Sequence, residues 1–500
     1  MKILFKSTII LFGISLFSRI MGFIRDTLTA KTFGTSNFMD AFNIAQTIPV
    51  LIFGILGSAL TTTLLPVFIE QQKTEQKVIN FLNILVSNLI IILIVILGFC
   101  FYYTNQIVDI IAPGFSTEQK DFTILITKIG LPSIIFMTLT AISISYLQSN
   151  KKFYGPNLIG VVLSSIIICY LLIFEDNYGV KGLMVVTTIA YVAQFIFLIP
   201  SLINCKWKFN LNINYKNDTF IKTILLMTPV ILGSTVDQIN FMVDRFLASN
   251  LSEGSISAIT YSSRLNGLIT GLFASSLGIL LFFENSKAVS NGDINLLKRQ
   301  IRKSLDILLI ICIPISLFIF INAETIVQMV FERGSFDSKS TYLTSSVLKY
   351  YSLGIPAIMA RDLLIKSFYS LKNTRTPMLN GIFTVILNIL LSVFLVEHLG
   401  LRGLAIASSI SFFVTSISLY FYLNNIIKLN LTYYLLENIF KIIITLGIIA
   451  IIIMVIKNIT YWDYNSYGIM SLEFIGIIFY FIILFNFKIK TVDEFKKRIF

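Results

Sequence analysis

Residues 79–104 form one continuous apolar run without a charged side chain, Ile79-Asn-Phe-Leu-Asn-Ile-Leu-Val-Ser-Asn-Leu-Ile-Ile-Ile-Leu-Ile-Val-Ile-Leu-Gly-Phe-Cys-Phe-Tyr-Tyr-Thr104. About 20 apolar residues suffice for a helix to cross a bilayer, so this run predicts a transmembrane helix. Similar runs recur along the whole chain. They lie at 5–31, 36–69, 121–149, 157–174, 182–204, 220–249, 255–284, 304–323, 341–371, 377–397, 401–424, 433–456 and 467–487.

These runs predict an all-α polytopic membrane protein of about fourteen transmembrane helices. The composition agrees, because 56% of the residues are hydrophobic and only 13% are charged, with a mean hydropathy of +0.83. Soluble domains carry roughly 25% charged residues, so most of this surface must face lipid. The runs at 36–69 and 341–371 are long and contain proline, and each is expected to be kinked or split. The first run contains Arg19, Arg25 and Asp26 and is expected to be a retained helix.

The net charge is +13, and the basic residues are distributed unequally between the two sides of the predicted membrane. If the N-terminus is cytoplasmic, the cytoplasmic ends and loops contain most of the lysine and arginine residues, which is a strong positive-inside bias. We therefore expect a bacterial inner-membrane protein with both termini in the cytoplasm and no nucleic-acid partner. Four scattered cysteines and one histidine, His398, provide no transition-metal spacing. Catalytic motifs are absent from the sequence, so an enzyme is not expected.

An internal repeat organises the chain. Gly179-Val-Lys-Gly-Leu183 recurs as Gly400-Leu-Arg-Gly-Leu404, and Pro156-Asn-Leu-Ile-Gly160 recurs as Pro377-Met-Leu-Asn-Gly381, both 221 positions later. Leu131-Pro-Ser-Ile134 similarly matches Ile355-Pro-Ala-Ile358. The matches predict two six-helix lobes in a parallel repeat around a central cavity. The expected boundaries are 1–205 and 217–425 for the lobes, 206–216 for a cytoplasmic linker, and 426–500 for two further helices and a tail.

Ionisable residues occur inside several predicted spans. A charge at mid-membrane costs at least about 2.5–3.5 kcal/mol and usually faces a wet cavity or a partner. Arg19 and Arg264 have no acidic neighbour within two residues, and guanidinium groups bind phosphate oxygens bidentately. These two are therefore candidates for holding an anionic head group. For Arg25–Asp26 and Asp244–Arg245, ion pairing with partners from other helices is an equally good interpretation.

Several motifs together resemble one known family. They are Ser18-Arg-Ile-Met-Gly-Phe-Ile-Arg-Asp26, Phe33-Gly34, Asp40-Ala-Phe42, Ile48-Pro49, Leu64-Leu-Pro-Val-Phe68, Gly254-Ser-Ile-Ser-Ala258, Tyr261 with Ser263-Arg-Leu265, Phe331-Glu-Arg-Gly-Ser-Phe336 and Phe368-Tyr-Ser-Leu-Lys-Asn-Thr-Arg-Thr-Pro377. The combination spans essentially the whole chain and resembles the MurJ (MviN) lipid II flippases of the MOP exporter superfamily. That resemblance implies two lobes around a cationic cavity.

The resemblance also implies site residues. By motif, the arginines that engage the lipid pyrophosphate fall on Arg19, Arg25 and Arg264, and the acidic residue that opens the second helix falls on Asp40. Many members carry arginine early in the second helix, whereas Pro49–Ser58 is uncharged here, and Gln46 is the expected replacement. Some members bind sodium. The matching positions are Asp244, Asn388, Ser392, Leu404 and Ser408, although a packing role is equally compatible with these Asn and Ser residues.

The expected function is a monomeric flippase that moves lipid II, the undecaprenyl-pyrophosphate-linked peptidoglycan precursor, from the inner to the outer leaflet. No cofactor is expected, apart from Na⁺ as a candidate coupling ion. The nearest alternative is a flippase for another lipid-linked oligosaccharide, of the O-antigen or capsule type. A cation-coupled multidrug antiporter and a non-transporting membrane scaffold are the remaining alternatives. Membrane lipids are the other expected partners.

Overall fold

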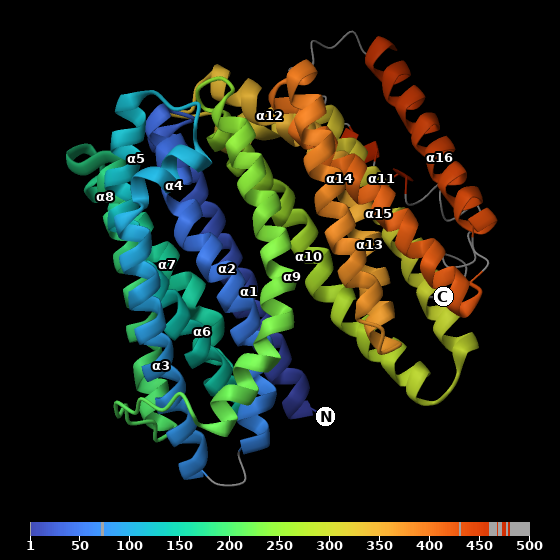
Figure 1. The fold of residues 1–500 in the computed structure, drawn as a ribbon. Helices are drawn as coiled ribbons and strands as arrows, with labels where there is room; N and C mark the ends of the chain where they lie inside the picture. The colour runs from blue at the N-terminus through green and yellow to red at the C-terminus, as the bar shows by residue number, and fades with distance from the viewer. Residues whose placement is uncertain are drawn as a thin grey trace. The chain divides into compact units, whose positions relative to one another are not determined.

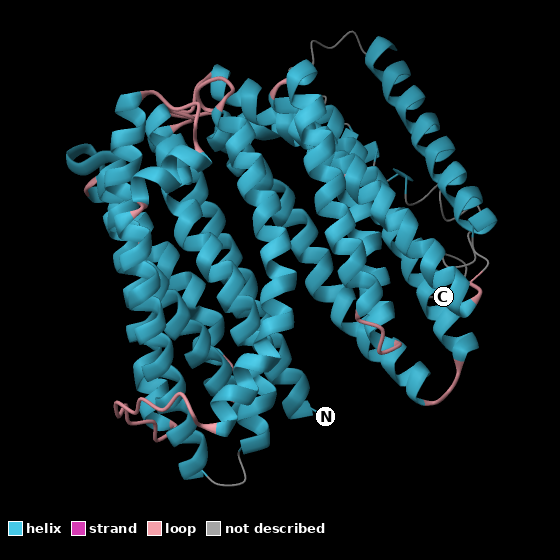
Figure 2. Ribbon diagram, in the orientation of Figure 1, coloured by secondary structure: helices cyan, strands magenta, loops and turns pink. Residues whose placement is uncertain are grey.

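The computed structural model describes residues 2–71, 75–429 and 432–459, together with residues 468, 473–476 and 479–480. All regular structure in these ranges is helical (Figure 2). This confirms the all-α polytopic fold. The helices are α1 (Lys2–Phe33), α2 (Asn37–Gln71), α3 (Glu75–Tyr102), α4 (Thr104–Ile111), α5 (Thr117–Gly130), α6 (Ser133–Ser149), α7 (Tyr154–Ile173), α8 (Glu175–Asn204), α9 (Asp218–Ser249), α10 (Ser255–Ser290), α11 (Ile294–Phe331), α12 (Ser338–Leu353), α13 (Ile355–Ser370), α14 (Arg375–Leu399), α15 (Leu401–Ile427) and α16 (Thr432–Ile459) (Figure 1).

Nine helical stretches among the described residues are long and apolar enough to cross a membrane. They are Asn37–Gln71, Gln76–Tyr102, Thr117–Ser149, Tyr154–Ile173, Glu175–Asn204, Asp218–Ser249, Ile294–Phe331, Arg375–Leu399 and Leu401–Ile427. Each coincides with a span predicted from the sequence. The predicted span 467–487 lies outside the described residues except for a few positions.

Proline breaks two predicted spans. The expected single helix 121–149 is instead α5 and α6, because Pro132 lacks the N–H that would continue the helix. The expected split of 341–371 is confirmed, since α12 ends at Leu353 and α13 begins at Ile355 with proline in its first turn. The span 36–69, by contrast, remains one helix, α2, with Pro49 and Pro66 inside it.

Two glycines of the repeated sequence motif have similar backbone conformations. Gly179 has φ 51° and ψ −146°, and Gly400, 221 positions later, has φ 56° and ψ −135°. Glycine adopts this left-handed conformation without the steric cost of a side chain. Gly179 forms a kink near the start of α8, and Gly400 lies between α14 and α15. The repeated motif therefore has a similar backbone turn at both places, and the two-lobe repeat itself stays a prediction.

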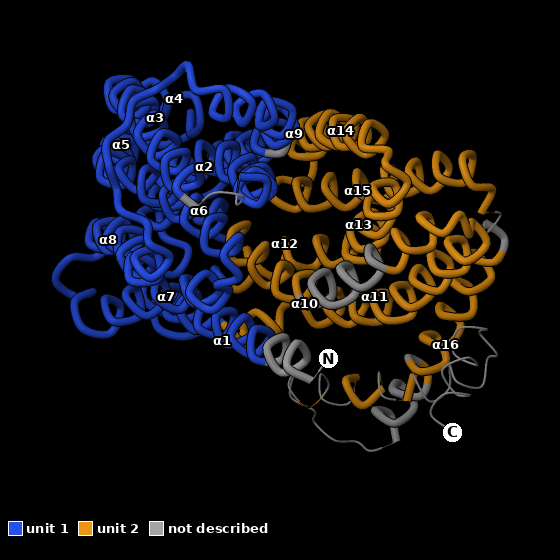
Figure 3. The backbone as a smooth tube through the Cα atoms, turned by 90° about the horizontal axis from the view of Figure 1, so that it is seen from below, with its two compact units in different colours: residues 1–258, 331–340 blue, residues 259–330, 341–500 orange. Residues whose placement is uncertain are grey.

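The chain separates into two compact units (Figure 3). Unit 1 contains residues 1–258 and 331–340, and unit 2 contains residues 259–330 and 341–500. In unit 1, a cluster of buried apolar residues is centred on α2, α3 and α6, with Phe68 packed edge-on against Phe81 and Tyr146. The lobe boundaries near 205 and 217 remain a prediction.

In unit 2, a buried carboxylate holds α16 against α11. The side chain of Asp306 is 1% exposed, and it accepts hydrogen bonds from Tyr434 Oη at 2.7 Å and Asn438 Nδ2 at 2.9 Å. The Arg302 guanidinium lies 3.3 Å from the centre of the Tyr434 ring. Ile310, Ile442 and Ile449 form the apolar contact beside these polar groups. Both the apolar and the polar contacts therefore fix α16.

Two glycines allow the 331–340 segment to pack closely against the end of α1 in unit 1. The Ser335 N–H donates to the Lys31 carbonyl at 2.7 Å, which brings the 331–340 segment onto the end of α1. Gly34 and Gly334 both have positive φ. A Cβ atom at Gly34 would lie 2.3 Å from the Ser335 carbonyl oxygen, and one at Gly334 would lie 2.5 Å from the Lys31 carbonyl oxygen. The glycines of the two sequence motifs are therefore required by the close approach of two backbones.

Asp40 joins α2 to the beginning of α10. Its side chain is 3% exposed. One carboxylate oxygen accepts from the Gly254 N–H at 2.8 Å, and the other accepts from the N–H and Oγ of Ser257 at 2.7 and 2.6 Å. These donors lie at a helix N-terminus, where unpaired N–H groups favour a negative charge. Asp40 thus caps α10 from more than 200 residues away in the sequence.

We predict that Asp40→Ala destabilises the protein by about 2–4 kcal/mol, because it leaves three buried donors without an acceptor. Thermal unfolding of the purified protein in detergent, followed with a thiol-reactive dye, measures the change. Asp121→Asn, on an exposed carboxylate of α5, is the control and should unfold like the wild type. An Asp40→Ala protein with an unchanged midpoint would show that the cap does not stabilise the fold.

Candidate functional site

Arg19 lies on α1 with its side chain half-buried. Neighbouring positions of α1 pack against α7, where Ser15 Oγ donates to Asn157 Oδ1 at 3.1 Å and a Cβ at Gly160 would approach Ser18 Oγ. Within the described part of the chain, Arg19 has no hydrogen-bond or ion-pair partner. An arginine without a partner in a membrane helix remains available to an anion.

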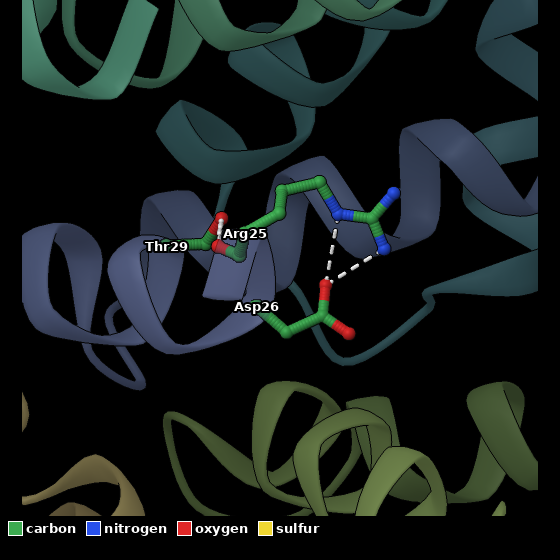
Figure 4. Close-up of polar contacts among 3 residues, drawn as sticks. All are labelled: Arg25, Asp26 and Thr29. Atoms are coloured by element: carbon green, nitrogen blue, oxygen red, sulfur yellow. Dashed lines mark hydrogen bonds and ion pairs between the residues drawn. The ribbon is translucent and has the colours of Figure 1, made fainter. Parts of the chain in front are cut away.

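Arg25 is paired with the residue next to it (Figure 4). Its Nε and Nη2 atoms lie 3.0 and 2.8 Å from Asp26 Oδ1, and the two side chains are 21% and 12% exposed. The expectation that these residues would take partners only from other helices is wrong, since the long arginine side chain folds back to its neighbour. Thr29 Oγ1 donates to the Arg25 carbonyl at 2.9 Å in the same turn. The pair reduces the cost of burying Arg25, and Nη1 takes no part in it.

Asp40 and Gln46 are the residues of α2 predicted to contact the head group, and both have partners or neighbours within unit 1. Both oxygens of Asp40 are used in capping α10, so its carboxylate is committed within the protein. Gln46 borders a cavity of about 10 Å³ together with Pro49, Met137 and Met184. That volume corresponds to about one water molecule, which is far less than a head group needs. In this structure, neither residue is placed as a head-group contact.

Asp244 and Arg245 lie side by side on α9 but have different surroundings. Arg245 is 5% exposed and donates through Nη1 to the Ile256 carbonyl at 2.9 Å, with its guanidinium 4.8 Å from the Phe241 ring centre. Asp244 Oδ1 is buried without a hydrogen-bond partner among the described groups. Buried polar atoms in native proteins are nearly always paired, so an orphaned carboxylate oxygen indicates a site for a cation or another donor.

In unit 2, four of the five predicted cation-site residues lie together. Asn388 Nδ2 donates to Ser408 Oγ at 3.0 Å, and Ser392 Oγ lies 3.4 Å from Asn388 Oδ1. Leu404 lies one turn before Ser408 on α15, and all four residues are buried. The fifth residue, Asp244, belongs to unit 1. Oxygen donors of this kind suit a hard cation. Among the described residues no three His, Cys, Asp or Glu side chains cluster as a metal site.

Arg264 and Arg361 both lie in predicted spans of unit 2. Arg264 is half-buried on α10. Arg361 donates to Asn380 Oδ1 at 3.2 Å, and Asn380 in turn donates to the Thr415 carbonyl and to Ser418 Oγ. Arg361 therefore connects α13 to α14 and α15. Sequence reasoning missed Asn380, although it lies in the repeated segment Pro377–Gly381, because repeat matching does not show which polar side chain is buried.

Sequence reasoning also missed a cavity of about 630 Å³ in unit 1. It is lined by Thr32, Phe33, Thr35, Ser36, Phe38, Phe122, Tyr178, Gly179, Val180, Lys181, Glu253, Ser335, Asp337, Lys339 and Ser340. Phe38 and Phe122 meet edge-on with their ring centres 5.0 Å apart. Ser340 donates to Asp337 from its N–H and Oγ, both at 2.8 Å, and these bonds hold the pKa of Asp337 below its usual value. The volume lies within the range of small-molecule sites.

Comparison with known proteins places this geometry in a family. The family model described as "Lipid II flippase MurJ" matches residues 29–473. The "Probable lipid II flippase MurJ" of Buchnera aphidicola subsp. Baizongia pistaciae is 31% identical over 422 residues, covering 83% of this chain and 82% of the relative. The protein of the same description from Rickettsia prowazekii is 28% identical over 481 residues, covering 95% and 94%.

Solved structures agree with the sequence comparisons. "Lipid II flippase MurJ, inward closed conformation" superimposes with a TM-score of 0.82 at 26% identity, covering 96% of this chain and 98% of that one. An inward-facing multidrug resistance MATE transporter of the MOP superfamily gives a TM-score of 0.65 at 14% identity, covering 85% and 99%. The second likeness shows a shared fold alone. From the match over residues 29–473 and the similarity to curated members over most of its length, the chain belongs to the MurJ family of lipid II flippases, which are multi-pass membrane transporters rather than enzymes.

Proposed function

We propose that this protein translocates lipid II, the undecaprenyl-pyrophosphate-linked peptidoglycan precursor, from the inner to the outer leaflet by alternating access. The observation that carries the proposal is the similarity to a solved lipid II flippase over 96% of the chain, at a TM-score of 0.82. The local backbone repeat at Gly179 and Gly400 supports alternating access, because repeated halves are the usual basis of rocking transporters.

Three arginines are proposed to bind the pyrophosphate. Arg19 has no partner among the described residues, and Nη1 of Arg25 lies outside its ion pair. Arg264 lies half-buried on α10, in the eighth predicted span. Guanidinium stays charged at any physiological pH and can donate two parallel hydrogen bonds to a phosphate. Folding has already removed part of the water around these arginines, so binding of the pyrophosphate does not have to provide that desolvation free energy again. The polyprenyl tail would remain in the lipid while the head group crosses.

The proposed orientation has both termini in the cytoplasm of a bacterial inner membrane, and the proposed functional form is a monomer. The positive-inside bias of the loops supports the orientation. A membrane potential of 100 mV is worth about 2.3 kcal/mol for each charge moved across it. The membrane potential can return the transporter to its starting state if the arginines become accessible first from one side of the membrane and then from the other.

Sodium is proposed as a coupling ion. Asn388, Ser392 and Ser408, with the backbone near Leu404, provide buried oxygens in unit 2, and Asp244 provides an unpaired buried oxygen in unit 1. An all-oxygen donor set fits a hard monovalent cation better than it fits a transition metal. The oxygens of Asn388, Ser392 and Ser408 support the proposal within unit 2, and the orphaned oxygen of Asp244 supports it within unit 1.

A flippase for another lipid-linked oligosaccharide is the second candidate. It is favoured by one departure from the family pattern, the uncharged segment Pro49–Ser58, together with the small cavity that Gln46 borders. The resemblance implies an arginine contact to the head group at this point of the helix, and this chain has no charged residue there to make it. The experiment below distinguishes the two candidates.

We predict that the wild-type protein restores growth and outer-leaflet lipid II in bacteria depleted of their own lipid II flippase. Arg19→Ala or Arg264→Ala should fail at equal membrane abundance, because each loses a pyrophosphate contact; a charge-assisted hydrogen bond is worth about 1.5–3 kcal/mol. Arg375→Ala, at an exposed residue of α14, is the control and should rescue. Rescue by all variants would remove the arginines from the mechanism, and failure of the wild type would favour the other oligosaccharide.

We predict that NaCl raises the thermal midpoint of the purified wild type above its value in equimolar KCl. Binding to the folded state at 100 times Kd stabilises it by about 2.7 kcal/mol. Asp244→Asn and Asn388→Ala should abolish this difference, whereas Asn291→Ala, at an exposed turn, should retain it. Equal midpoints of the wild type in the two salts would exclude sodium binding at these residues.

A further inference from the structure

The segment between α8 and α9 lies as an extended strap along α3. Residues 205–217 contain no helix, and Figure 2 shows them within the long pink loop near the lower end of α3. Side chains of α3 bond the strap in register. Trp207 Nε1 donates to Asn83 Oδ1 at 2.9 Å, and Asn83 Nδ2 donates to the Lys208 carbonyl at 3.2 Å. Five residues further on, the Asn212 N–H donates to Ser87 Oγ at 3.0 Å.

The hydrogen bonds continue to the end of the strap. Asn88 Nδ2 donates to the Asn214 carbonyl at 3.1 Å, and Asn212 Nδ2 donates to Asn80 Oδ1 at 2.9 Å. The α3 side chains of Asn83, Ser87 and Asn88 are 6%, 1% and 0% exposed. The strap therefore covers the polar face of α3, and each segment pairs several polar groups of the other, although Asn88 Oδ1 takes no hydrogen bond from the described residues.

The other side of the strap is apolar and uncovered. Phe209, Leu211, Ile213 and Tyr215 are 52%, 66%, 52% and 46% exposed. They alternate with asparagines, as expected for an extended chain whose successive side chains point to opposite faces. Four large apolar side chains in one exposed row form a patch that soluble surfaces rarely carry.

The apolar stretch of α3 is longer than the hydrocarbon core is thick, which leaves room for this row near one end of the span. This stretch, Gln76–Tyr102, has 27 residues, about 40 Å at 1.5 Å per residue, whereas the hydrocarbon core is roughly 30 Å thick. The strap lies along the first half of this stretch, between Asn80 and Asn88. Irregular backbone is tolerated at that depth only when its polar groups are satisfied, and the α3 side chains satisfy several of them. Exposed Ile203 and Ile221 continue the apolar surface on both sides.

The strap also carries positive charge beside its exposed apolar row. Lys206, Lys208 and Lys216 are exposed, and residues 205–217 contain no Asp or Glu. Trp207 and Tyr215 stand at its two ends, and these residue types are enriched at membrane interfaces. Lysines next to inserted apolar side chains are the usual recognition elements for anionic lipid surfaces.

We propose that residues 206–216 are a lipid-binding strap, which inserts Phe209, Leu211, Ile213 and Tyr215 into the bilayer interface and binds anionic phospholipid head groups through Lys206, Lys208 and Lys216. The strap links the sixth and seventh spans, so lipid bound there attaches the connection between the two halves of the chain to the membrane. This inference does not depend on the transported substrate. It goes beyond the proposed function by assigning a lipid site outside the translocation route.

Tryptophan fluorescence tests the proposal directly, because the chain has two tryptophans and Trp462→Phe leaves Trp207 alone. The full-length variant is placed in nanodiscs of phosphatidylcholine that contain a minor fraction of brominated lipid. Brominated phosphatidylglycerol should quench Trp207 more strongly than the same fraction of brominated phosphatidylcholine. Trp207→Phe in a second sample reports the contribution of Trp462.

The lysines are tested by Lys206→Gln, Lys208→Gln and Lys216→Gln together. Each lysine near an anionic surface contributes about a fivefold preference, so the triple variant should lose the excess quenching by phosphatidylglycerol. Lys181→Gln, Lys287→Gln and Lys372→Gln together change the net charge equally at exposed positions outside the strap and should preserve it. Absence of quenching by both lipids would place the strap in water or under protein and overturn the proposal. Excess quenching that survives in the strap variant would also overturn it.

Discussion

Hydrocarbon offers no hydrogen bonds, and the rest of this structure depends on that constraint. Each polar group that folding takes into the membrane must find its partner inside the chain. The hydroxyl groups find it locally, as when Thr63, Thr187 and Thr415 donate to carbonyls one turn earlier at 2.6–2.7 Å. Charged side chains need partners from other helices or more than one partner, and the chain provides these in several different ways.

The charged side chains differ in whether they have hydrogen-bond or ion-pair partners within the folded protein. Asp40 and Asp306 each connect two helices through at least two hydrogen bonds. Arg245 connects α9 to α10 through the Ile256 carbonyl and also packs on the Phe241 ring of its own helix. Arg25 is partly offset by Asp26. Arg19 and one oxygen of Asp244 remain without partners in the described structure. A membrane protein retains such unpaired groups at a cost in stability, and for that reason we propose these two for the anionic substrate and the cation.

The strap beside α3 follows from the same constraint at the edge of the bilayer. Asparagine and serine on a membrane helix would be costly against lipid, and an extended backbone would be costly there too. Bonding each to the other reduces both costs and leaves an apolar row exposed on the outer side of the strap. The glycine contacts between the end of α1 and the 331–340 segment use a different device, since there the backbones approach too closely for any side chain.

The sequence by itself determined the class of the protein, most of its spans, its repeat and its family. Those features are local: about twenty apolar residues decide insertion wherever they occur, and the turns at Gly179 and Gly400 repeat because their motifs repeat. Pro132 still split a span that hydropathy alone predicts as continuous.

Only the tertiary structure decided which polar groups are used and which remain available. Asp40 meets Ser257 across 217 positions, and Asn83 meets Trp207 across 124. Hydropathy along a chain records the transfer energy of each segment, whereas a hydrogen bond depends on two atoms that only the folded chain brings within 3 Å. For that reason Arg19 could be selected from its sequence surroundings, while the roles of Asp40 in capping α10 and of Asn380 in linking three helices required the fold.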